Sequence, residues 1–242
     1  MIRTDFAEGQ VQRQSGWLLP IAVFVITAAL SALFLIYYLR PSPRSLSEEQ
    51  PWPTSDTEVV RLSVHKLALA VPSNYLIFRS ARDGGPQKDV SMFALLPDFH
   101  GYSDAEAQSF ASNAPDSQVI YLLVEEDRLG LSESERLQRI YLNYVANPQG
   151  APGPFGLTEY AFRDDSGYRG EDLFVGQTAK GTALFRCVRF SQDVPSPSCL
   201  RETHLAHGVT LSYRFKRAYL AHWREIGDGA DTFIHGFIAR AQ

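Results

Sequence analysis

The sequence is poor in cysteine and has no excess of basic residues. Only two of its 242 residues are Cys, which is too few for a disulfide scaffold or a four-thiolate zinc site. Lys and Arg total 23 against 27 Asp and Glu, a net charge of −4, which argues against a protein whose main role is to bind nucleic acid. With 45% hydrophobic and 21% charged residues, the chain is neither collagen-like nor disordered, and its length suits one or two domains.

The short motifs of common catalytic and cofactor sites are also missing. The chain contains no CxxC, HExxH, GxGxxG or G-x-S-x-G motif and no Walker lysine. We therefore expect no cofactor, and no catalytic residue can be assigned from a motif.

Long hydrophobic runs are absent except for one near the N-terminus. Residues 17–39 carry no charge, and as a helix at about 1.5 Å per residue they would cross a hydrocarbon core of about 30 Å. Trp17 at one end and Tyr37 and Tyr38 at the other are residue types that favour the headgroup layer. A buried core helix or a cleaved signal peptide are the rival interpretations. Because the run exceeds a signal-peptide core of about 7–15 residues and no A-x-A-like site follows it, we predict a retained single-pass anchor after a short tail at 1–16.

The charges beside this run do not set its orientation. Arg3 and Arg13 precede the run and Arg40 and Arg44 follow it, which is a tie under the positive-inside rule. The run is the first hydrophobic segment, and both cysteines come after it. These two features favour a signal-anchor with a short cytoplasmic N-terminus and an exported C-terminal domain.

A proline-rich linker separates the anchor from one globular domain. Residues 40–56 contain four prolines and no helical periodicity, which is typical of an extended spacer. Residues 57–242 are enough to bury a core as a single domain.

The pattern of apolar residues in this domain predicts an α+β fold with a mainly antiparallel sheet. A Ser103-x-x-Glu106 capping box predicts a short helix to about residue 114, and an amphipathic stripe from Leu220 to Phe237 predicts a C-terminal helix packed on the sheet, with a kink expected at its glycines. Residues 133–145 suit a helix or a strand, and a capping box at Ser132 favours the helix. The expected strands are 58–71 (as one or two), 90–96, 118–125, 157–162, 172–177, 182–190, 199–206 and 209–215.

Two groups of residues are candidates for a site. Cys187 and Cys199 lie on two expected strands that flank a loop, and in an exported domain they would form a disulfide; the rival interpretation is a reactive thiol activated by His204. Four carboxylates near glycines make a candidate calcium site, although their spacing departs from the EF-hand and a solvated turn is the commoner outcome. These carboxylates are Asp164, Asp165, Glu171 and Asp172.

The remaining polar clusters carry no specific chemistry. His204 and His207 would lie on opposite faces of a strand, so they do not predict a metal site. Arg214, Lys216 and Arg217 could contact an anionic partner, but the solvent face of the last strand is the favoured interpretation.

Several short motifs resemble those of the single-pass "transmembrane anchored" proteins of unknown function in proteobacteria. The matching segments are the N-terminal span, Val71-Pro72-Ser73-Asn74-Tyr75, Phe155-Gly156-Leu157-Thr158, Ser166-Gly167-Tyr168, Phe174-Val175-Gly176, Arg186-Cys187 with Cys199, and Tyr213-Arg214-Phe215 before Trp223. The resemblance implies a bacterial envelope setting and brings no activity or catalytic residue.

Together with the resemblance, these features predict a domain that is anchored in the bacterial inner membrane, lies in the periplasm and binds another cell-envelope component, most simply a protein, without catalysis. One form of this would be an immunity-type or inhibitor protein that blocks an envelope toxin. The alternatives are an accessory subunit of an inner-membrane complex, or an envelope hydrolase that uses His100 and the carboxylates of residues 164–172. The sequence indicates no oligomeric state.

Overall fold

The computed structural model divides into two compact units, Met1–Gln50 and Pro51–Gln242. It describes residues 16–39, 49–206 and 208–241. In the first unit, helix α1 (Leu18–Leu39) has a mean hydropathy of 2.6 over Leu19–Tyr37 and is long and apolar enough to cross a membrane. The ring side chains of Trp17 and Tyr37 are exposed, whereas the side chain of Tyr38, the flanking arginines and residues 40–48 of the expected linker lie outside the described part.

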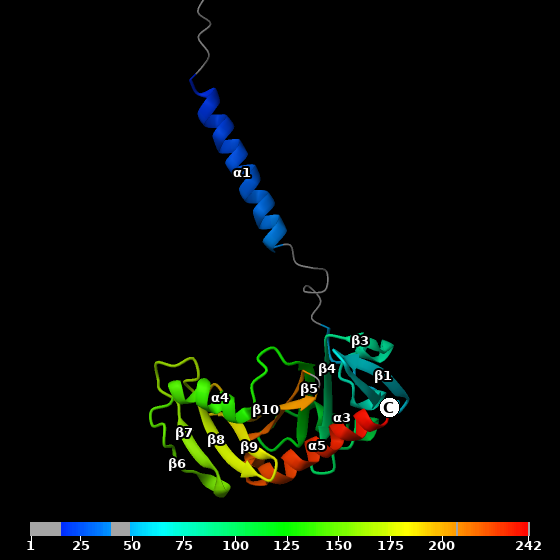
Figure 1. Cartoon of the computed structure of the whole chain (residues 1–242). Coiled ribbons are helices and arrows are strands. Elements are labelled where there is room, and N and C mark those ends of the chain that lie inside the picture. Colours follow the sequence, from blue (N-terminus) through cyan, green and yellow to red (C-terminus); the bar gives the residue numbers. More distant parts are fainter. Residues whose placement is uncertain (1–15, 40–48, 207, 242) are drawn as a thin grey trace, which may run out of the picture. The chain divides into compact units, whose positions relative to one another are not determined.

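The second unit contains the predicted antiparallel sheet. Eight strands follow the order β4-β5-β11-β10-β9-β8-β7-β6, and every neighbouring pair is antiparallel (Figure 1). A second sheet has the order β2-β1-β3, because the first expected strand forms a hairpin that turns at His65. The strands are β1 (Val59–Val64), β2 (Leu67–Pro72), β3 (Gly85–Gln87), β4 (Asp89–Leu95), β5 (Val119–Glu126), β6 (Ala151–Pro152), β7 (Thr158–Ala161), β8 (Glu171–Thr178), β9 (Gly181–Val188), β10 (Ser198–Ala206) and β11 (Val209–Lys216).

Helix α5 (Trp223–Ala239) packs its apolar stripe on the core, as the sequence predicts. Residues Arg217–His222 form a 3-10 helix, so α5 begins three residues later than the stripe suggests. The glycines do not break the helix, because α5 runs without interruption through both Gly227 and Gly229. A Cβ added at Gly229 would lie 2.4 Å from the Phe99 ring, so this glycine lets the helix approach the loop after β4 closely.

The two capping-box predictions have different outcomes. Ser132 and Glu135 form the capping box of α4 (Glu133–Arg139), which a 3-10 helix follows at Tyr141–Asn143, so the helical prediction for this segment is confirmed. The box at Ser103 is wrong. The Ser103 hydroxyl donates to the Glu106 carboxylate at 2.7 Å instead of capping the backbone. The short helix expected after Ser103 is present, as a 3-10 helix at Asp104–Glu106 that continues into α3 (Ala107–Ala111), and it ends three residues before the predicted residue 114.

Part of the expected linker lies on the globular unit. The Trp52 backbone N–H donates to the Ile77 carbonyl at 2.9 Å, and the Ser55 hydroxyl donates to the Asp104 carboxylate at 2.7 Å. Residues 51–56 are therefore held against the globular unit by hydrogen bonds.

The large sheet is interrupted in its middle. Strands β8 and β9 pair along eight residues each, and β10 follows β11 over almost its whole length. In contrast, β9 and β10 pair only at Cys187↔Cys199 and Arg186↔Leu200. The two strands diverge beyond these pairs, and α4 contacts both of them. This divergence places polar side chains where a continuous sheet would have backbone hydrogen bonds.

Candidate functional site

Cys187 and Cys199 form a disulfide at the point where β9 and β10 pair. Both residues are fully buried in the main core. The bond therefore links the two halves of the interrupted sheet, and neither cysteine is a free thiol for His204 to activate. A bond of this kind indicates an oxidising compartment.

Loss of this disulfide is expected to lower the free energy of unfolding by about 3 kcal/mol, because it closes a loop of about 13 residues in the unfolded chain. The change is Cys187→Ala with Cys199→Ala, and the measurement is urea unfolding of the full chain in detergent. Maleimide labelling of the wild-type chain should appear only after reduction. Labelling of both thiols without reduction would contradict the exported location.

The acidic loop that suggested calcium binding is occupied by arginines. Three of its four candidate carboxylates form ion pairs, and the fourth, Asp164, is exposed. Within the described part of the chain, no group of three or more His, Cys, Asp or Glu side chains is placed to hold a metal ion. The ion pairs are Asp165 with Arg163 (3.1 Å), Glu171 with Arg186 (3.0 Å), and Asp172 with Arg189 (2.6 Å) and Arg217 (2.7 Å).

The interpretation of Arg214, Lys216 and Arg217 as a solvent face is wrong for two of the three. The Lys216 ammonium is buried, donates to Asn113 Oδ1 at 2.5 Å and to Ser196 Oγ at 2.7 Å, and has a pKa lowered by burial and by Arg214. Arg217 is paired with Asp172, and only Arg214 is exposed. The reason is that other parts of the chain contact these two side chains: Asn113 and Ser196 lie against Lys216, and the Arg217 guanidinium also donates to the Val188 carbonyl of β9 at 2.9 Å.

Four of the histidines that the structure describes, His65, His100, His204 and His235, lie beside carboxylates. His100 Nε2 lies 2.9 Å from Glu106 Oε1, so its hydrogen-bond partner is not in the 164–172 loop proposed for a hydrolase. His204 Nδ1 lies 3.3 Å from Asp127 Oδ2, and the pKa of this carboxyl is lowered: burial raises it, but hydrogen bonds from backbone N–H groups and His204 outweigh that effect. His207 lies outside the described residues.

The divergence of β9 and β10 opens a polar cleft of about 450 Å³, which we call the central cleft. Its walls come from four parts of the chain, namely α4, the β8–β9 hairpin, strands β10 and β11, and α5. At its rim, Lys180 of the hairpin forms an ion pair with Asp231 of α5. The side chains that line it include Glu133, Lys180, Arg201, Tyr213, Trp223 and Asp231.

A buried chain of hydrogen bonds forms the floor of the central cleft. The Arg201 guanidinium donates to both Glu133 oxygens, at 2.9 and 3.0 Å, and to the Tyr213 hydroxyl at 3.1 Å. Glu133 Oε1 also accepts from the Leu184 N–H of β9, at 2.9 Å, where β10 no longer pairs with that strand. Burial lowers the pKa of Arg201, but the bonds to Glu133 and Tyr213 outweigh it and raise this pKa further above its ordinary value.

Burial raises the pKa of Tyr213 to about 12, against the smaller opposing effect of Arg201. In the unfolded chain, Tyr213 ionises near pH 10. The stabilising contribution of the neutral, buried Tyr213 hydroxyl is therefore complete below pH 10 and is lost as pH rises through 12. We expect a loss of about 3 kcal/mol over this interval. Urea unfolding at pH 9, 10, 11 and 12 would measure it. The free energy of unfolding should fall less steeply with pH in Tyr213→Phe, which keeps all the other tyrosines and so controls for them. An equal fall in this variant would contradict the assignment of the pH dependence to Tyr213.

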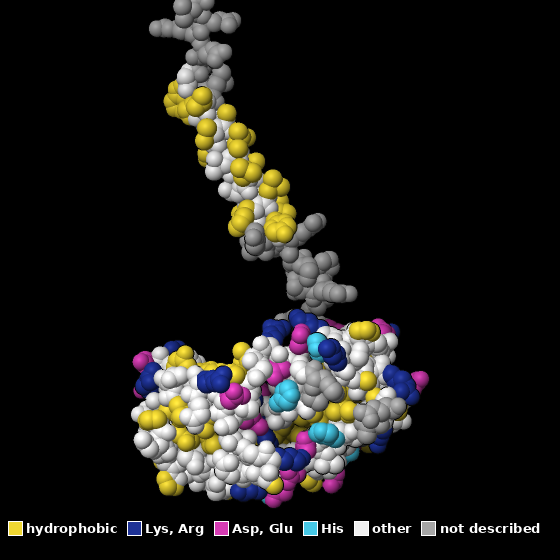
Figure 2. Space-filling model, in the orientation of Figure 1, with side chains coloured by type: hydrophobic (Ala, Val, Ile, Leu, Met, Phe, Trp, Pro, Cys, Tyr) yellow, Lys and Arg dark blue, Asp and Glu magenta, His cyan; other side chains and the backbone are white. Residues whose placement is uncertain are grey.

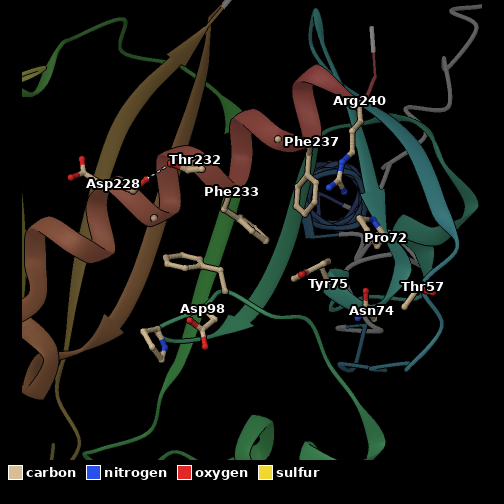
Figure 3. A pocket seen from close by; sticks show the side chains of 14 residues that line it. Thr57, Pro72, Asn74, Tyr75, Asp98, Asp228, Thr232, Phe233, Phe237 and Arg240 are labelled. Atoms are coloured by element: carbon tan, nitrogen blue, oxygen red, sulfur yellow. Dashed lines mark hydrogen bonds between the residues drawn. The ribbon is translucent and has the colours of Figure 1, made fainter.

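A second cleft, of about 830 Å³, lies between α5, the segment that directly follows β2, and the loop that follows β4 (Figure 3). We call it the aromatic cleft, because four rings line it in mutual contact: Tyr75, Phe99, Phe233 and Phe237, with centroids 4.6–5.7 Å apart. Figure 2 shows a hollow in one face of this unit, with hydrophobic side chains inside it and charged and His side chains around it. Asp228 of α5 lines both clefts.

The two clefts differ in the groups that they offer. In the central cleft, the Glu133 carboxylate and the Arg201 guanidinium are paired with each other. The central cleft offers ion pairs and hydrogen-bonding groups, and the aromatic cleft offers aromatic surface, at the edge of the same helix. Protein interfaces are built from such groups.

Comparison with known proteins gives one informative result. No protein-family model matches this chain, and no curated protein matches it. A solved structure that it resembles is that of Smlt3025, an immunity protein of the Stenotrophomonas maltophilia type IV secretion system, with a TM-score of 0.53 and 14% sequence identity. The match covers 81% of this chain and 99% of the other. At this identity the likeness shows a shared fold.

Proposed function

We propose that this protein is an immunity-type protein of the bacterial envelope, whose globular domain binds a toxin and blocks it. The observation that carries the proposal is the fold shared with a type IV secretion immunity protein, because the match includes 99% of that chain. Fold alone does not determine function, so the proposal also depends on the compartment and on the surface of this chain.

Two features support an exported location. Helix α1 has the length and composition of a membrane span, and disulfides such as Cys187–Cys199 persist in oxidising compartments. We propose that α1 stays in the inner membrane as a single-pass signal-anchor and that the globular unit lies in the periplasm. We also propose that the resemblance to proteobacterial "transmembrane anchored" proteins reflects the same location in the bacterial envelope. After a carbonate wash, the full chain should remain in the membrane fraction; release of a shortened soluble chain would show that α1 is a cleaved signal sequence.

The clefts on both sides of α5 support binding of a protein partner. Aromatic rings and paired charges lie at the surface of one helix that the core holds firmly. A rigid helix with such groups is a suitable platform for a protein interface.

The test is growth in competition. A strain that lacks the gene is mixed with its parent strain, and its survival is compared with that in a culture of its own. We expect survival beside the parent to fall at least tenfold and to be restored by the full chain. Equal survival with and without the gene would contradict the immunity function. Purification in mild detergent with a stoichiometric membrane subunit would instead indicate an accessory subunit.

A further inference from the structure

The 17 residues of α5 include three glycines, which weaken a helix relative to alanine. Two of them have a reason within the fold. A Cβ at Gly229 would lie 2.4 Å from Phe99, and a Cβ at Gly227 would lie 3.0 Å from Arg201 Nη1. The third, Gly236, is different, because an added Cβ would meet no atom within 4 Å. Gly236 lines the aromatic cleft, so its missing side chain enlarges a space that the described residues leave open.

The same cleft contains a polar atom without a partner. Asn74 Nδ2 donates to the Tyr102 carbonyl at 3.2 Å, but Asn74 Oδ1 is buried and accepts no hydrogen bond from any residue that the structure describes. A buried acceptor of this kind is costly unless something donates to it. Asn74 lies beside Tyr75 in the lining of the cleft (Figure 3), where an occupant could provide an N–H group.

The charges of the cleft are separated along its length. Asp98 and Asp228 lie toward one end and Arg240 toward the other (Figure 3). All three side chains are exposed, and none forms an ion pair with another described residue. The four rings lie between the two ends. The cleft therefore has an acidic end, an aromatic centre and a basic end.

We propose that the aromatic cleft is the docking site for an exposed segment of the partner protein, and that this segment carries an aromatic side chain between a basic and an acidic residue. This inference rests on the proposed function and specifies the surface and the partner chemistry. The aromatic side chain enters the space beside Gly236 and contacts the rings. The basic residue pairs with Asp98 and Asp228, and the acidic residue pairs with Arg240. Rotation of the Asn74 amide toward the cleft would let an N–H group of the segment donate to Oδ1. The volume of about 830 Å³ is within the range of about 300–1,000 Å³ seen for binding pockets.

The first test uses three synthetic peptides and the full chain in detergent. Two peptides have the sequences Lys-Lys-Ser-Trp-Leu-Ser-Glu-Glu and its exact reverse, and the third has Ser in place of all four charged residues. Because the direction of the docked segment is not fixed by the cleft, we expect one of the charged peptides to bind at least tenfold more tightly than the neutral one. Similar affinities for all three, or no binding, would overturn the inference.

Variants of the chain locate the binding. Gly236→Trp fills the cleft from the helix and should weaken the better peptide at least tenfold. His235→Trp is the matched control, since His235 is the adjacent exposed residue and does not line the cleft; it should change affinity less than twofold. Gly236→Ala should raise the unfolding temperature while it weakens binding. Asp98→Lys with Asp228→Lys should remove the preference for a charged peptide. Unchanged binding in Gly236→Trp would overturn the proposed site.

The competition test separates this inference from the proposed function. If the wild-type chain protects and folded Gly236→Trp protects equally well, the immunity function stands and the docking site is wrong. If the wild-type chain gives no protection, the immunity function is wrong, and the peptide titrations alone decide whether the cleft binds. A dimer in sedimentation that Gly236→Trp dissociates would show that a second copy covers the cleft, which also overturns the inference.

Discussion

Glu133→Ala is expected to lower the free energy of unfolding by about 3–5 kcal/mol, the range for breaking one side of a buried ion pair. The side chains of Glu133 and Arg201 are only 9% and 13% exposed, so neither charge is well solvated. Without the carboxylate, the Tyr213 hydroxyl is the one hydrogen-bond acceptor that the Arg201 guanidinium keeps among the described residues, and the Leu184 N–H loses its acceptor. Urea unfolding of the full chain measures the change.

Two further variants show whether the charge pair is responsible. Glu133→Leu with Arg201→Met removes both charges and should cost less than Glu133→Ala, because no buried charge remains unpaired. Arg139→Ala removes an exposed ion pair with Glu135 on the same helix and should change stability by less than about 0.5 kcal/mol. A loss below about 1 kcal/mol for Glu133→Ala would show that water replaces the carboxylate in the central cleft.

The order of elements could be predicted because it depends on local patterns. The alternation of Val209, Leu211, Tyr213 and Phe215 gives β11, and Ser132 and Glu135 give the start of α4. The apolar stripe of α5 was visible for the same reason. Each of these signals lies within a few residues, where backbone geometry and side-chain periodicity are directly related.

The clefts could not be predicted, because they depend on contacts between distant parts of the chain. Glu133 and Arg201 are 68 residues apart, and no pattern near either residue indicates the other. The divergence of β9 and β10 is likewise invisible in sequences that both suit an ordinary strand. A lysine at a strand end is usually exposed, so the sequence predicts a solvent position for Lys216; Asn113 and Ser196, which are 103 and 20 residues away along the chain, cover it instead. The glycines within the stripe of α5 are the one signal of the clefts in the sequence. By themselves they suggest a kink, whereas in the structure Gly227 and Gly229 allow Arg201 and Phe99 to approach the helix closely.

Trp223→Ala is expected to cost about 3–5 kcal/mol, the range for truncation of a buried Trp. Trp223 is fully buried at the start of α5, contacts the Phe185 ring edge to face at 5.7 Å, and donates its indole N–H to the Phe155 carbonyl at 3.2 Å. A Cβ at Gly176 would lie 2.5 Å from its ring, so the strand below is shaped to receive it. Thermal and urea unfolding measure the loss.

The same variant tests whether the two clefts depend on one helix anchor. Trp223 lines the central cleft, whereas the aromatic cleft lies farther along α5, from Asp228 to Arg240. If Trp223 fixes the whole helix against the sheet, Trp223→Ala should weaken peptide binding at the aromatic cleft even at temperatures where the chain is folded. Trp223→Phe keeps a ring but not the bond to Phe155, and should retain most of the stability and the binding. Loss of stability without any loss of peptide affinity would show that the rings of Phe233 and Phe237, packed against Tyr75 and Phe99, hold their end of α5 independently.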